Sequence, residues 1–158
     1  MYLAIVALTM FVLPLASMII DHAFHASDPW LFLLGRWFVF WGVGVRLGLA
    51  GARQYFQPAF TAKEIFHISG DEALLLVREL GVANAATALI GLLSLAAPSF
   101  ILPVAISACF FYAVAGIRHV AESSRSSNEN VAMASDLFMG AVLGVFVVGT
   151  LAGRGLGG

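Results

Sequence analysis

Residues 2–20 read YLAIVALTMFVLPLASMII and contain no charged side chain. A run of about 20 apolar residues is long enough for a helix to cross the hydrocarbon core of a bilayer. No Lys or Arg precedes this run, and it is longer than the apolar core of about 7–15 residues in a cleaved secretory signal. We therefore interpret the segment as a retained first transmembrane helix, bent at Pro14.

The composition of the chain is that of a membrane protein. Of the 158 residues, 61% are hydrophobic and 11% are charged, against about 45–50% and about 25% in soluble domains. A soluble protein of this length needs many polar groups on its surface, so lipid must cover most of this chain. The net charge of −1 argues against a nucleic-acid partner, which needs a basic face. The one cysteine, Cys109, excludes an internal disulfide and multi-cysteine metal motifs.

Further apolar segments follow the first one along the chain. They are residues 30–53, 72–97, 100–121 and 130–152. Between the second and third segments, residues 59–68 have apolar side chains at helical spacing with Lys63 and Glu64 among them, which is typical of an interfacial helix. We predict an all-α fold of one domain over residues 1–158, with about five transmembrane helices and a short interfacial helix between the second and third.

The distribution of Lys and Arg predicts the orientation in the membrane. With the N-terminus in the cytoplasm, the cytoplasmic side has Arg53, Lys63, Arg118 and Arg125. The basic residues toward the outside are then Arg36 and Arg154. Because cytoplasmic loops have an excess of positive charge, we expect a multi-pass protein with a cytoplasmic N-terminus and a glycine-rich C-terminal tail outside.

Polar and ionisable residues lie inside the apolar segments, near their cytoplasmic ends. We select as candidates for binding a ligand or a proton Arg46, Glu79, Asn84, His119, Glu122 and Asp136. Ionisable residues are costly inside a bilayer and usually face a protein interior or a water-filled cavity. At about 1.5 Å per residue, Arg46, Glu79 and Asp136 lie about 10 Å inside their helix ends. Arg53 and Arg118, nearer the helix ends, are interpreted as reaching the lipid headgroups.

Glycines form stripes on two of the predicted helices. Gly44, Gly48 and Gly51 share one face of the second helix, and Gly140 and Gly144 form a GxxxG motif in the fifth. Small residues at this spacing allow two helix backbones to approach closely. We predict that these glycines are helix-packing positions, either within one subunit or between subunits of a homo-oligomer.

Three functional interpretations fit this pattern. The favoured one is a small transporter or channel-like protein, with Glu79, His119 and Asp136 as titratable groups and Arg46 as the counter-charge. The second is a non-catalytic subunit or assembly partner of a membrane complex, in which polar residues only join the helices. The third, and least favoured, is a membrane-embedded metal or redox enzyme with His119 and Glu122 as weak candidate ligands. The sequence indicates no catalytic residue and no cofactor.

Several short motifs in the last two thirds of the chain resemble a known family. They are KEIF at residues 63–66, VRELGVAN at 77–84, AGIRHV at 115–120, NE at 128–129 and SDLF at 135–138. With these motifs the chain resembles an uncharacterised family of small bacterial integral membrane proteins, the DUF6790 type. Its layout is also similar to that of DoxX-like membrane proteins. The resemblance implies a helical protein of the bacterial inner membrane, and it implies no activity.

Overall fold

A computed structural model of the chain describes residues 2–68, 70–122 and 125–155. In these residues the regular secondary structure is entirely helical. The side chain of Arg154 and residues 156–158 of the glycine-rich tail lie outside the described part. Their predicted position outside the membrane therefore stays a prediction.

Five helical stretches of the described chain are long and apolar enough to cross a membrane. These spans are Leu3–Phe24, Trp30–Phe56, Glu72–Leu93, Pro98–Ala121 and Ser127–Gly153. A short helix lies between the second and third spans, at residues 58–65. The predicted all-α bundle is confirmed, and the chain is a multi-pass membrane protein.

Two of the spans contain a π-helical segment. The first span consists of α1 (Tyr2–Ala7), the π-helical η1 (Leu8–Val12) and α2 (Leu13–Phe24). The second consists of α3 (Trp30–Phe38), the π-helical η2 (Val39–Val45) and α4 (Arg46–Phe56). Segment η1 ends two residues before Pro14, whose ring would clash with the carbonyl of Met10, four residues earlier, in a regular α-helix. The wider π turn accommodates the proline, and the span continues through it as one helix; the bend at Pro14 stays a prediction.

The remaining elements complete the bundle. The short helix is formed by α5 (Pro58–Phe60) and the π-helical η3 (Thr61–Ile65). The third span is α6 (Glu72–Leu93), and the fourth consists of the 3₁₀ turn η4 (Pro98–Phe100) and α7 (Ile101–Ala121). The fifth span lies in α8 (Ser127–Gly155).

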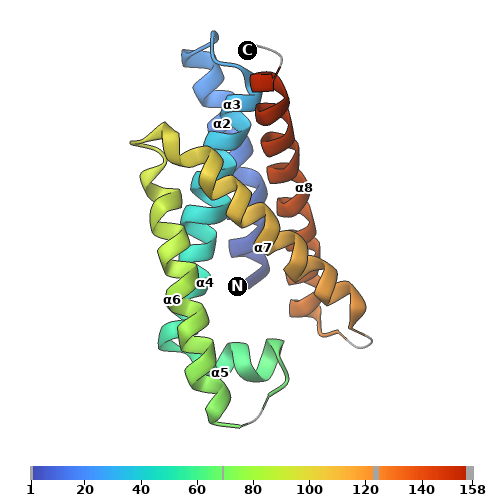
Figure 1. Ribbon diagram of the computed structural model, residues 1–158. Helices are drawn as coiled ribbons and strands as arrows, with labels where there is room; N and C mark the ends of the chain where they lie inside the picture. The colour runs from blue at the N-terminus through green and yellow to red at the C-terminus, as the bar shows by residue number, and fades with distance from the viewer. Residues whose placement is uncertain (1, 69, 123–124, 156–158) are drawn as a thin grey trace.

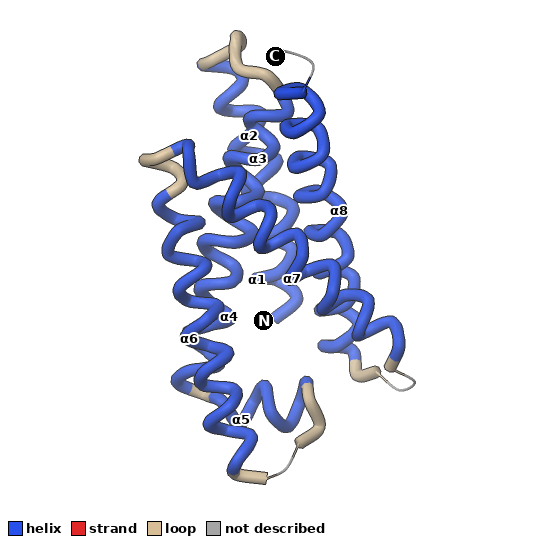
Figure 2. The backbone as a smooth tube through the Cα atoms, viewed as in Figure 1, coloured by secondary structure: helices blue, strands red, loops and turns tan. Residues whose placement is uncertain are grey.

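Among the described helices, α4 packs along α6 and α7 packs along α8. Figure 1 shows α7 leaving α6 near η4 and crossing diagonally toward the lower end of α8, so the two pairs separate at that end. The α5–η3 segment lies at the same lower end, next to the start of α6 (Figure 2). The loop between α2 and α3 and the end of α8 lie at the opposite end.

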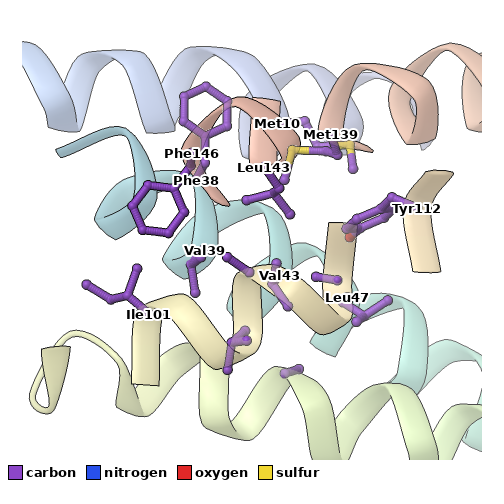
Figure 3. Packing of buried hydrophobic residues seen from close by; sticks show 14 of the residues in the cluster. Met10, Phe38, Val39, Val43, Leu47, Ile101, Tyr112, Met139, Leu143 and Phe146 are labelled. Carbon is purple, nitrogen blue, oxygen red and sulfur yellow. The ribbon is translucent and has the colours of Figure 1, made fainter. Parts of the chain in front are cut away.

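The hydrophobic core lies where the first two spans meet α7 and α8 (Figure 3). Its most buried members include Met10, Phe38, Val43, Met139 and Leu143, each at most 1% exposed. Large apolar side chains elsewhere on the spans point outward, for example Leu76 at 70% exposed and Phe110 at 74%. An apolar exterior around a small core is the pattern expected for a protein that lipid surrounds.

Glycines bring the backbone of the second span, in η2 and α4, into contact with that of α6. A Cβ atom added at Gly51 would lie 2.7 Å from the carbonyl oxygen of Gly81, and one at Gly91 would lie 2.8 Å from the backbone nitrogen of Gly44. At Gly48 the added atom would lie 3.3 Å from the Cβ of Ala88. No side chain fits at the two closest points. The stripe on the second span is therefore used for packing within the chain.

A buried carboxylate joins the first two spans at the end of the bundle where the loop between α2 and α3 lies. Asp21 accepts a hydrogen bond from Trp37 Nε1 at 2.8 Å and one from His25 Nδ1 at 2.9 Å, and it forms an ion pair with Arg36 at 3.2 Å. The first helix therefore continues to Phe24, four residues past the predicted end at residue 20. The Asp21 carboxylate is tolerated at this buried helical position because these hydrogen bonds and this ion pair replace its contacts with water.

We expect Asp21→Ala to lower the free energy of unfolding by about 2–3 kcal/mol, because hydrogen bonds to a charged group are worth about 1.5–3 kcal/mol. Thermal unfolding of the detergent-solubilised protein measures this loss. Asp71→Ala is the matched control, since Asp71 is exposed and its side chain does not cap α6. Equal stability of the two variants would contradict a joining role for Asp21.

Candidate functional site

A cavity of about 610 Å³ lies between the α4–α6 pair and the α7–α8 pair. Side chains from both pairs, from α1 and from the α5–η3 segment line it. Its volume falls within the range of about 300–1,000 Å³ that is typical of small-molecule sites. Most of the lining is apolar, so the few polar side chains determine which molecules it can accept.

The charged lining groups are mainly cationic. Arg46 and Arg53 reach the cavity from α4, Arg118 and His119 from the end of α7, and Asp136 from α8. Among the described lining residues, three are arginines and Asp136 is the only carboxylate. The lining therefore has an excess of positive charge, which favours a ligand with a negative group.

Arg46 and Asp136 form the inner part of this polar region. Both side chains are half-buried, and the Arg46 guanidinium is close enough to the Asp136 carboxylate for an electrostatic interaction. The two residues lie on α4 and α8, which belong to different helix pairs. They therefore connect the two walls of the cavity within the span region.

Hydrogen bonds hold other parts of the wall in place. Asn84 Nδ2 on α6 donates to Gln54 Oε1 on α4 at 2.8 Å, and both side chains line the cavity. The hydroxyl of Tyr112 on α7 donates to the carbonyl oxygen of Gly42 at 2.7 Å. Gly42 lies in the π-helical segment η2, where the wider turn departs from regular α-helical bonding. The polar groups are thus positioned by contacts between spans.

Residues 58–68, which we name the cap segment, form the wall of the cavity at the lower end of the bundle. Phe60 and Phe66 of this segment line the cavity. The Cζ atom of Arg53 lies 3.6 Å from the centroid of the Phe60 ring, and that of Arg118 lies 5.4 Å from the centroid of the Phe66 ring. These cation–π contacts connect the cap segment to both helix pairs.

The cap segment is also connected to the start of α8. His67 Nε2 lies 3.2 Å from Glu129 Oε1, and Glu129 is 2% exposed. The backbone of His67 has a positive φ of 54°, an uncommon conformation for a residue other than glycine. Glu129 also accepts a hydrogen bond from the backbone of Ser126 at 2.7 Å, while Ser126 Oγ accepts one from the backbone of Glu129 at 3.3 Å. This reciprocal pair is a capping box.

Comparison with known protein families identifies the family of this chain. A family model described as "Family of unknown function (DUF6790)" matches residues 4–154. The chain belongs to the DUF6790 family. The predicted resemblance is confirmed and extends to nearly the whole chain. No curated protein and no solved structure matches the chain.

In this DUF6790 member, four of the predicted site residues line one cavity. They are Arg46, Asn84, His119 and Asp136. Glu79 and Glu122 do not line this cavity, and both side chains are exposed. The buried face of α6 contains Val77, Gly81 and Asn84, and at about 100° per residue Glu79 points nearly opposite to it. Glu122 follows the last residue of α7, where the backbone is extended and leaves the helix.

Sequence reasoning missed the parts of the site that depend on the cap segment. Arg53 and Arg118 were expected at the lipid headgroups, but they line the cavity and contact Phe60 and Phe66. The capping box had a recognisable signal, a serine three residues before a glutamate at the start of a helix. The contact between Arg53 and Phe60 had no such signal, because it depends on how the loop folds back.

A metal site has limited support in the described residues. No group of three or more His, Cys, Asp or Glu side chains in the described part of the chain could hold a metal ion. His119 lines the cavity, whereas Glu122 is exposed. The candidate pair therefore has no third ligand of these types among the described residues.

Proposed function

We propose that this DUF6790 protein is a small transporter or channel-like protein, and that its solute passes through the cavity between the helix pairs. The supporting observation is the concentration of Arg46, Arg53 and Arg118 around one cavity inside the membrane-spanning region. Arg46 lies deepest in its span, and charged groups inside a span are costly and usually mark substrate or ion pathways. A cluster that only joined helices would balance its charges, whereas the described lining contains three arginines for one carboxylate.

Asp136 and His119 are the proposed proton-binding groups of this pathway. Both line the cavity, and neither takes part in the cation–π contacts that hold the cap segment. Arg46 is the proposed counter-charge of Asp136, with which it interacts electrostatically. Protonation of Asp136 would remove one negative charge from the lining and so change the attraction for an anionic solute.

The proposed setting is the bacterial inner membrane, with the chain as one domain and its N-terminus in the cytoplasm. The basic residues support this orientation, since Arg53, Lys63 and Arg118 belong to elements at one end of the bundle. Arg36 lies at the opposite end, where Asp21 balances its charge. The positive-inside rule counts Lys and Arg near the span ends, so it favours the end with Arg53, Lys63 and Arg118 as the cytoplasmic one.

Proton flux into proteoliposomes tests the proposal. Vesicles contain a pH-sensitive dye and an imposed inward proton gradient, with or without external p-toluenesulfonate, a permanently charged organic anion. A channel is expected to admit protons faster than protein-free vesicles do, and a coupled carrier to do so once the anion is present. Asp136→Asn is expected to return the rate to that of protein-free vesicles, because it removes the only carboxylate among the described lining residues.

Glu79→Gln is the matched control, since it also neutralises a carboxylate within a span but at an exposed position away from the cavity. Its flux is expected to equal that of the unchanged protein. Wild-type vesicles that are no faster than protein-free vesicles under both conditions would contradict the proposal. If Asp136→Asn lowers thermal stability while flux is unchanged, the assembly role explains the polar residues better.

A further inference from the structure

The cavity reaches the lipid-facing surface of the bundle through its apolar wall. Leu49, Phe110 and Val114 line the cavity, yet they are 49%, 74% and 51% exposed. Phe110 and Val114 lie in the middle part of the Pro98–Ala121 span. Residues that belong to both the cavity and the outer surface mark the place where the two meet. The apolar side of the cavity therefore opens toward the hydrocarbon region of the bilayer.

The cationic side of the cavity lies at a different depth. Arg118 follows Phe110 by eight residues on α7, which corresponds to about 12 Å along the helix. Arg53 lies near the end of α4, beside the cap segment. The cavity thus has guanidinium groups near the ends of the spans and an apolar opening nearer the middle of the membrane. This arrangement matches a molecule with a charged head and a hydrocarbon tail.

Arg53 has a hydrogen-bond donor that no described residue of the protein uses. Its Nε atom is buried and has no hydrogen-bond partner among the described residues. The face of its guanidinium packs on the Phe60 ring, with Cζ 3.6 Å from the ring centroid. Stacking covers the face and leaves the N–H groups directed outward in the guanidinium plane, where they can bind an anionic oxygen. A buried, unsatisfied donor costs free energy that a ligand would recover.

We propose that the cavity binds an amphipathic anion. Its carboxylate, phosphate or sulfonate head would contact Arg53 and Arg118, and its hydrocarbon tail would leave between Phe110 and Val114 toward the lipid. The inference names the class of solute that would pass through the cavity. For the biological use of the site it therefore rests on the proposed function. The chemistry is shared by a single-chain fatty acid and by an anionic phospholipid, which the experiment separates.

Binding to the full chain in a neutral detergent tests the inference without any flux measurement. The probe is cis-parinaric acid, a fluorescent fatty acid. Unlabelled oleate or phosphatidylglycerol is expected to displace it. Three compounds are expected not to displace the probe. Oleyl alcohol has the tail without the charge, acetate has the charge without the tail, and phosphatidylcholine is zwitterionic. Displacement by phosphatidylglycerol identifies a membrane lipid as the source, and displacement by oleate alone identifies a single-chain acid; either result supports the inference.

Arginine variants test the proposed position of the head. Arg53→Gln and Arg118→Gln are each expected to weaken binding by about tenfold or more, because hydrogen bonds to charged groups are worth about 1.5–3 kcal/mol. Arg78→Gln, an exposed arginine outside the cavity lining, is the matched control and is expected to bind normally. If Arg53→Gln fails to fold, Arg118→Gln decides the question, since Arg118 is exposed.

Two results would overturn the inference. One is displacement of the probe by oleyl alcohol as effectively as by oleate. The other is equal binding by Arg118→Gln and Arg78→Gln. Failure of the inference can be told apart from failure of the proposed function. Binding of the probe without flux in proteoliposomes removes the transport role, whereas Asp136-dependent flux without probe binding removes only the amphipathic ligand.

Discussion

Replacing Gly81 with leucine is expected to lower the stability of the bundle by about 3 kcal/mol or more. A Cβ at this position would lie 2.8 Å from the carbonyl oxygen of Gly51 and 2.9 Å from the backbone nitrogen of Tyr55. Both neighbours are backbone atoms, so the leucine fits only if α4 and α6 move apart. Leucine also gains less than about 1 kcal/mol of helix propensity over glycine, which is too little to offset the clash.

Gly153→Leu is the matched control for this prediction. Gly153 also lies in a span, but a Cβ there would meet no atom within 4 Å. Its thermal midpoint in detergent is expected to stay close to that of the unchanged protein, while that of Gly81→Leu falls by about 10 °C, at about 2–4 °C per kcal/mol for this chain length. Similar midpoints for both variants would mean that the contact between α4 and α6 is not a close backbone contact.

The membrane fold was predictable from the sequence because its signals are local. Residues 2–20 carry enough apolar length to cross a bilayer regardless of how the other helices pack. The glycine stripe of Gly44, Gly48 and Gly51 likewise identified the face of the second span that contacts another helix. The end of the first span was harder to place, because Asp21 stays helical only through its contacts with the second span.

The candidate site was predictable in part. Arg46 and Asp136 were recognisable because an ionisable residue deep in a span needs a polar environment, and His119 was recognisable as an ionisable residue in the last turn of α7. Glu79 is a carboxylate inside a span, as Asp136 is, but it lies on the exposed face of α6. Its depth along the span does not reveal which face it is on. The contact of Arg53 with Phe60 joins a span to the cap segment, and a loop that folds back over a helix end leaves no periodic pattern in the sequence.

Introducing tryptophan at Ala115 is expected to abolish flux through the protein. Ala115 lies in α7 and lines the cavity, one turn before Arg118 and His119. An indole group there would occupy space next to the guanidinium groups that the proposed solute contacts. The side chain points into an existing cavity, so it can be accommodated with less overpacking than in the filled core. We therefore expect a folded protein that has lost its pathway.

The most direct test of the account compares Ala115→Trp with Ala141→Trp in the proteoliposome flux assay. Ala141 is an exposed residue of α8 within the fifth span and does not line the cavity. The account predicts flux at the level of protein-free vesicles for Ala115→Trp and unchanged flux for Ala141→Trp, with similar thermal midpoints for the two variants. Full flux through Ala115→Trp would contradict the claim that the cavity is the functional site.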